Sequence, residues 1–187
     1  ERDHVEIDFS GSRLSLDLIP HADFEGFEAD PIPASVNIYD PTLYSDDSHV
    51  DEWQREGRAS YVLAKRSWEL LGSPLRSRPY GTVDLTIRLV RMDSLPANMS
   101  CLNPAHFEQV LLRFTYYNGP ASPEFAKRKA PINWQTDEKG KGTWIYFETH
   151  RDFSDEPERK LTFEPTHMDS KLSIPLGDRH FLQLNFR

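Results

Sequence analysis

The stretch that most constrains the fold is residues 81–93, with the sequence GTVDLTIRLVRMD. Its apolar side chains recur at every second position, namely Val83, Leu85, Ile87 and Leu89. Polar residues fill most of the positions between them, which is typical of a β-strand that buries one face. This stretch therefore predicts a sheet with an apolar side.

A second stretch, residues 107–117, shows a similar alternation. Its apolar positions include Val110, Leu112, Phe114 and Tyr116. We expect it to form a strand that lies antiparallel beside the first. Asn103 and Pro104 precede it and predict a single helical turn at its start.

Further strands are expected along most of the chain. Residues 5–18 predict a hairpin around the turn Ser10-Gly11-Ser12. Residues 59–71 are ambiguous, because Tyr61 and Val62 favour a strand whereas Ala64 and Glu69 favour a helix, and we prefer the strand. The other predicted strands are residues 35–39, 132–135, 143–149, 160–163 and 181–187, and we expect the last to dock the C-terminus into the sheet.

Short helices are expected at two places. Ser48, Asp51 and Gly57 provide start and stop signals for a helix near residues 48–56, with Trp53 as its apolar anchor. Ser122 and Pro123 predict another over residues 123–129. The sequence thus predicts a mainly β fold in a single domain, residues 1–187, built as an antiparallel β-sandwich or curled sheet with two or three short helices.

The charge balance narrows the choice of partners. The chain has 30 acidic and 22 basic side chains, with a formal net charge of -8. A negative surface repels phosphate backbones and anionic lipid headgroups. We therefore expect no binding to nucleic acid or to a membrane surface, and a basic protein is the partner class that the charge favours.

The sequence lacks the motifs of metal, nucleotide and nucleophile chemistry. Cys101 is the only cysteine, so no intramolecular disulfide forms, and no two histidines are three to five residues apart. No glycine-rich turn of the phosphate-binding type is present. We predict no cofactor, no metal and no catalytic residues. Glu148 is the one carboxylate that we would test for hydrolysis.

Two segments carry aromatic residues beside charge. Residues 40–56 form the most acidic stretch, and residues 132–149 place tryptophans around a charged turn. Aromatic anchors rimmed by charge are typical of protein interfaces, although the same residues could serve only the core and solubility. The predicted contact residues are Tyr44, Asp46, Asp47, Asp51, Glu52, Trp53, Asp137 and Glu138.

The chain as a whole resembles a family of bacterial immunity proteins. A strand-rich acidic body with one cysteine, ending in SIPLGDRHFLQLNFR, is similar to the periplasmic lipoproteins that antagonise type VI secretion phospholipase effectors. The family's lipid-bearing cysteine would stand near the start of the precursor, whereas Cys101 lies deep in the chain. The chain begins at Glu1, so we expect either a leader removed on export, which could have carried that cysteine, or a trimmed fragment.

The resemblance implies a function without a reaction. The domain would bind its cognate toxin in the periplasm and cover the active site, and only a lipid anchor would tie it to a membrane. Two alternatives stay open at this stage. A carbohydrate-binding module would stack sugars on Trp134, Trp144 or Tyr146, and a glycoside hydrolase-like enzyme would assemble carboxylates, including Glu148, in space.

Overall fold

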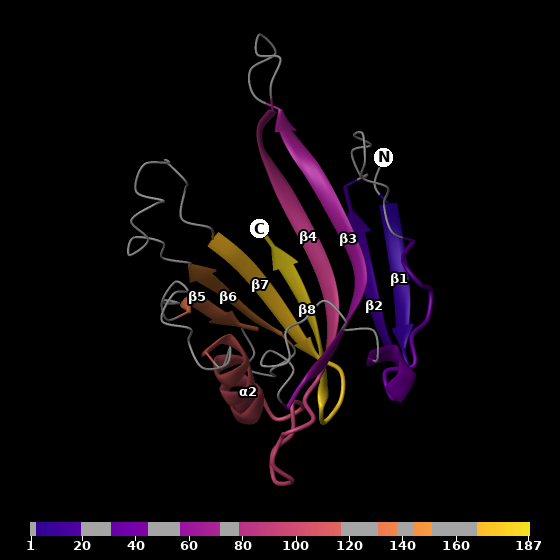
Figure 1. Ribbon diagram of the computed structural model, residues 1–187, viewed down its shortest axis with the longest axis vertical. Coiled ribbons are helices and arrows are strands. Elements are labelled where there is room, and N and C mark those ends of the chain that lie inside the picture. The colour runs from indigo at the N-terminus through magenta and orange to yellow at the C-terminus, as the bar shows by residue number, and fades with distance from the viewer. Residues whose placement is uncertain are drawn as a thin grey trace.

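The computed structural model describes residues 3–19, 31–44, 57–71, 79–116, 131–137, 144–150 and 168–187. Within these ranges the chain forms eight β-strands, one α-helix and one short 3-10 helix (Figure 1). The strands make two sheets, and every pairing between named strands is antiparallel. The predicted mainly β fold, as a sandwich or curled sheet, is confirmed.

The larger sheet has six strands in the order β3-β4-β8-β7-β6-β5. Their bounds are β3 Ala59–Leu71, β4 Pro79–Arg91, β5 Ile132–Thr136, β6 Ile145–His150, β7 Met168–Pro175 and β8 His180–Phe186. The expected strand at residues 81–93 is thus β4, and the ambiguous residues 59–71 are all strand. The last strand, β8, lies between β4 and β7, so the C-terminus is docked inside the sheet as predicted.

The smaller sheet is the predicted hairpin, formed by β1 (Asp3–Phe9) and β2 (Ser12–Leu18). Ser10 and Gly11 form its two-residue loop with φ angles of 54° and 103°. Positive φ at both loop residues matches the right-handed twist of the flanking strands. The Gly11 N–H also donates to Asp8 Oδ1 at 2.8 Å.

The six-stranded sheet has an apolar cluster on each face. Leu89 and Val90 are adjacent in β4, yet Leu89 belongs to the cluster under the hairpin and Val90 to the cluster under the helix α2. Successive residues of a strand point to opposite faces, so the hairpin and α2 cover opposite sides of the sheet. Figure 1 shows the hairpin at the right and α2 at the left of the sheet.

The predicted strand at residues 107–117 is wrong, because residues 107–116 belong to the helix α2 (Pro104–Tyr116). Phe107, Val110 and Leu111 are buried, and their spacing of three and four residues is that of a helix face. The Asn103 side chain accepts hydrogen bonds from the N–H groups of Ala105 and His106, at 3.0 and 3.3 Å. The predicted cap is therefore real, but it opens a full helix instead of a single turn.

The strand expected at residues 35–39 is reduced to one parallel bridge between Ser35 and Asp8. Beyond Val36 the backbone turns, with the Asp40 N–H donating to the Asn37 carbonyl at 3.1 Å, and enters the 3-10 helix η1 (Pro41–Tyr44). The sequence prediction also missed β7. The expected helices at 48–56 and 123–129 and the expected strand at 160–163 lie outside the described residues.

Candidate functional site

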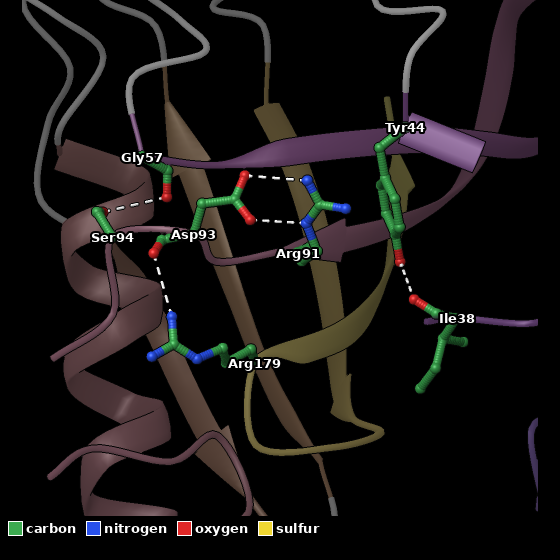
Figure 2. A network of polar contacts seen from close by, with 7 residues as sticks. All are labelled: Ile38, Tyr44, Gly57, Arg91, Asp93, Ser94 and Arg179. Carbon is green, nitrogen blue, oxygen red and sulfur yellow. Dashed lines mark hydrogen bonds and ion pairs between the residues drawn. The ribbon is translucent and has the colours of Figure 1, made fainter. Parts of the chain in front are cut away.

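The candidate site lies where η1 ends and β3 begins. Residues 45–56, which make up most of the acidic segment, follow the first of these points in the chain and precede the second. We call them the inserted segment. Tyr44, Gly57, Arg91, Asp93 and Ser94 meet there, and we call these five residues the anchoring network (Figure 2). Three of them come from the end of β4 and the connection after it. One short stretch of chain therefore contacts both ends of the inserted segment.

Tyr44 holds the first end. Its side chain is buried, its hydroxyl donates to the Ile38 carbonyl at 2.8 Å, and burial raises its pKa. The Arg91 guanidinium lies over its ring, with Cζ 4.4 Å from the centroid, which is a cation–π contact. Asp40 begins η1 by accepting hydrogen bonds from the N–H and hydroxyl of Thr42, and these bonds lower the pKa of Asp40.

Arg91 is itself fixed by Asp93. Two contacts join the side chains, Nε to Oδ1 at 2.6 Å and Nη2 to Oδ2 at 3.3 Å, in the fork arrangement that restrains a guanidinium. This hydrogen bonding raises the pKa of Arg91. The Arg179 guanidinium donates to the Asp93 carbonyl at 3.1 Å, so the turn between β7 and β8 braces the same point.

Gly57 holds the second end. Its carbonyl accepts hydrogen bonds from both the N–H and the hydroxyl of Ser94, at 3.0 and 3.1 Å. Its φ angle is 73°, and a Cβ added there would lie 2.5 Å from the Ser94 Cβ. The position needs glycine both for backbone geometry and for space. The sequence pattern indicated Gly57 only as the end of a helix.

His180 packs against this network from β8. It is only 7% exposed, and its ring lies 6.2 Å from that of Tyr44. His180 is also the partner of Arg91 in the pairing of β4 with β8. Burial, followed by the nearby charge of Arg91, lowers the pKa of His180. The imidazole is therefore kept neutral near pH 7.

Of the predicted contact residues, only Tyr44 and Asp137 lie within the described residues. Tyr44 is buried and anchors the acidic segment, while Asp137 is half-buried just after β5. The other predicted residues, Asp46, Asp47, Asp51, Glu52, Trp53 and Glu138, lie outside them, and their contacts stay a prediction.

The second predicted interaction segment, the β5–β6 hairpin, distributes its aromatic residues over both sheet faces. Trp134 stacks on Phe147, with centroids 5.0 Å apart; Phe147 belongs to the apolar cluster under α2, and Trp134 packs against that cluster. Tyr146 stands between Ile145 and Phe147 in β6, so it points to the other face. Trp134 and Tyr146 therefore cannot stack on the same sugar chain.

Glu148, the carboxylate that we singled out for hydrolysis, has close polar neighbours. It accepts hydrogen bonds from Asn133 Nδ2 at 2.6 Å and from the Tyr146 hydroxyl at 2.7 Å. Asn133 has a φ angle of 53°, where the register of the β5–β6 pairing shifts. The cluster thus ties an irregular edge strand to its neighbour.

An open pocket of about 520 Å³ lies beside β1, lined in part by Asp3, His4, Glu6 and Arg66. Both ring nitrogens of His4 face carboxylates, with Nδ1 2.8 Å from Asp17 and Nε2 3.6 Å from Glu6. The hydrogen bond that His4 donates to the Asp17 carboxylate raises the pKa of His4. Within the described ranges, no group of three or more His, Cys, Asp or Glu side chains is arranged to hold a metal ion. Cys101 is buried, and burial raises the pKa of its thiol to about 11.

Most of the anchoring network was missed at the sequence level. Arg91, Asp93 and Ser94 follow a strand and look like ordinary polar residues of its end and of the next loop. The one local signal was Gly57. The rest depends on β4 lying beside both β3 and β8, which strand alternation alone does not specify.

No helix within the described ranges is long and apolar enough to cross a membrane. No family model matches the chain, and no curated protein or solved structure matches it either.

Proposed function

We propose that this chain is a non-catalytic immunity protein that binds a toxin enzyme with a basic surface and covers its active site. The observation that carries the proposal is that both ends of the acidic segment are fixed by one anchoring network. The family resemblance makes a phospholipase effector of type VI secretion the first toxin to test, and the periplasm the first compartment.

Fixed ends favour binding through the inserted segment. A loop loses conformational entropy when a partner orders it, and that loss weakens the complex. Tyr44 and Gly57 are already held before any partner arrives, so part of this entropy has been lost on folding. Holding these two residues therefore costs no further entropy when a partner binds.

The charge of the segment favours a basic partner. Residues 40–56 contain six carboxylates and one arginine. Clustered like charges at an interface accelerate encounter with a partner of opposite sign, and this effect weakens with salt. A stable inhibitory complex should bury about 800 Å² on each partner, which requires contacts beyond the segment itself.

The first experiment is capture of the target. The immobilised domain would be exposed to lysate of its own source, and retained proteins identified by mass spectrometry. We expect one hydrolase whose turnover falls as the domain is titrated in. Retention of glycans alone would refute the proposal, and turnover by the domain itself that is lost in Glu148→Gln would favour the hydrolase alternative.

The second experiment reverses the charge of the segment. The triple variant Asp46→Lys, Asp47→Lys and Asp51→Lys should slow association with the captured hydrolase at low salt, by about tenfold or more. The matched control reverses Asp3, Glu6 and Asp17 on the β1–β2 hairpin, which changes the net charge equally. Equal association rates for the two triple variants would contradict a role for the acidic segment.

A further inference from the structure

The open pocket beside β1 lies along a strand edge that has no partner strand within the described residues. On one side β1 pairs with β2, and on the other it makes a single parallel bridge, from Asp8 to Ser35. The pocket of about 520 Å³ has the size of a ligand site. Its walls are formed by residues 3–6 of β1 and by Ile32, Ala34 and Arg66.

The parallel bridge shows how the backbone of β1 is directed. The Asp8 N–H donates to the Ala34 carbonyl at 3.0 Å, and the Asp8 carbonyl accepts from the Val36 N–H at 2.8 Å. Both polar backbone groups of Asp8 therefore face away from β2. Backbone groups of a strand alternate between its two edges, and the register of β1 with β2 runs without a shift. His4 and Glu6 therefore direct their backbone groups to the same side as Asp8.

The backbone of His4 and Glu6 thus faces the pocket that these two residues line. Val5 and Ile7, which alternate with them, exchange their hydrogen bonds with β2. In the part of the chain that the structure describes, no backbone group pairs with the N–H or the carbonyl of His4 or of Glu6. Each residue offers one donor and one acceptor, and the two residues lie about 7 Å apart along the strand.

We propose that the pocket beside β1 binds an extended peptide segment of another protein, which adds a strand to the open edge of the β1–β2 hairpin. An extended peptide presents its own donors and acceptors at the same two-residue spacing, and strand addition to a sheet edge is an established mode of peptide binding. The pocket walls carry the carboxylates of Asp3 and Glu6 and the guanidinium of Arg66. Because both signs of charge are present, the backbone provides the recognition.

The walls also indicate the side-chain pattern of the peptide. Val5 and Ile32 are partly buried and pack against the apolar cluster under the hairpin. The side chains of His4 and Glu6 are more than half exposed, at 57% and 56%. Since side chains of a strand alternate between faces, the peptide should carry apolar residues at every second position. The inference is independent of the proposed function, because the pocket contains no residue of the anchoring network.

The test compares two substitutions at Glu6. Glu6→Pro removes the N–H that faces the pocket and leaves the hydrogen bonds to β2 in place, because proline is tolerated at a strand edge where no ladder bond is donated. Glu6→Gln removes the charge and keeps the N–H, so it is the matched control. The probe is a phage-displayed library of short linear peptides selected on the wild-type protein. Selected peptides would then be synthesised and titrated against all three proteins.

We expect selected peptides with alternating apolar residues that bind wild type and Glu6→Gln within about twofold, and Glu6→Pro about tenfold or more weakly, because a backbone hydrogen bond is lost only in the proline variant. Circular dichroism would show that each variant keeps its fold. Amide hydrogen exchange on the wild-type protein gives a second measurement that needs no variant. The N–H groups of His4 and Glu6 should exchange rapidly in the free protein and slowly with peptide, whereas those of Val5 and Ile7 should be slow in both.

Several outcomes would overturn the proposal. One is that no peptide is enriched, and another is that the selected peptides bind Glu6→Pro as tightly as wild type. Slow exchange of His4 and Glu6 in a free monomer would mean that another part of the same chain occupies this edge. A concentration-dependent dimer in sedimentation that is lost in Glu6→Pro would replace the foreign peptide with a second copy of this chain.

Discussion

The anchoring network and the β5–β6 hairpin are both aromatic segments beside charge, yet the fold uses them differently. In the network, Tyr44 is buried as an anchor under Arg91, while Tyr39 nearby is left in solvent. In the hairpin, Trp134 and Phe147 stack in the apolar cluster under α2. Similar composition therefore produces a buried anchor at the end of η1 in one place and a piece of core in the other.

This difference shows that backbone geometry decides whether an aromatic side chain is buried in the core or left exposed to solvent. In a strand, neighbouring side chains alternate between faces, so an aromatic cluster in the sequence is divided between core and surface. Around a turn and a 3-10 helix, no such alternation applies, and Tyr39 and Tyr44 can both lie against His180 with opposite exposure. The following predictions test this contrast, from the largest expected effect to the smallest.

Phe147→Ala should be the most damaging change, because it removes a fully buried ring from the cluster under α2. We expect a loss of about 3–5 kcal/mol in the free energy of unfolding, measured by urea denaturation. The control is Ile132→Ala in the same hairpin, where the side chain is 43% exposed and the loss should be much smaller. A loss at Phe147 as small as that at Ile132 would mean that the Phe147 ring does not contribute to the core.

Gly57→Ala should disturb the network at its second end. The new Cβ would meet Ser94, and the backbone would keep a φ of 73° that disfavours alanine, so we expect a cost of about 2–4 kcal/mol in urea denaturation. Gly11→Ala is the control, since its φ is also positive but no atom lies within 4 Å of the added Cβ. Its cost should be only about 1–2 kcal/mol. Adding Ser94→Gly should recover part of the loss at Gly57 and none at Gly11.

Arg91→Met should weaken the first end of the network. It removes a cation–π contact and a partly exposed ion pair, worth together about 1–2 kcal/mol of unfolding free energy. Arg179→Met removes one hydrogen bond to the Asp93 carbonyl and should cost less. If the network positions the acidic segment, Arg91→Met should also slow association with the captured hydrolase. Phe147→Ala, measured at a low temperature at which it is still folded, should associate at the wild-type rate. Equal association rates for Arg91→Met and wild type would separate the network from binding.

The smallest expected effect is in the pH dependence of stability. The pKa of His180 is lowered in the folded state, so the unfolded chain binds more protons, and stability is lost as pH falls below about 6.5 toward the folded pKa. His180→Phe should therefore lose less free energy of unfolding, measured in urea, between pH 7.5 and 5.5 than wild type does.

His4 is the control, because its pKa is shifted in the opposite direction. Its raised pKa gives stability that is present below about pH 6.5 and lost as the pH rises above that value. His4→Gln should therefore steepen the acid loss, and identical pH profiles for both variants would contradict the assignment.

Strand alternation predicted much of the fold correctly but failed at residues 107–117. Val110 and Leu112 alternate as in a strand, while Phe107, Val110 and Leu111 also fit a helix face. The same residues therefore fit both the two-residue period of a strand and the period of a helix. The helix forms because its buried face covers an apolar face of the sheet and because Asn103 caps it. Strand β7 was missed for a different reason: Lys171 and Ser173 are buried but polar, so the sequence of this strand does not show an apolar alternation.

The candidate site was less predictable than the fold. The acidic segment and the aromatic character of Tyr44 were visible in the sequence, but the partner of Tyr44, Arg91, lies 47 residues further along the chain. Tyr39 was assigned to the end of a strand, and its exposure depends on the turn at Asn37. Sequence patterns report local periodicity, and these contacts are not local.

The sequence by itself determined the acidic charge, the strand-rich architecture, the Ser10-Gly11 turn and the cap at Asn103, because each depends on residues close together in the chain. Only the tertiary structure decided which strands are neighbours, which aromatic residues are buried, and that β4 and the connection after it fix both ends of the acidic segment. The reason is that sheet order brings together residues that are distant in sequence, and burial on either face is shared among several elements.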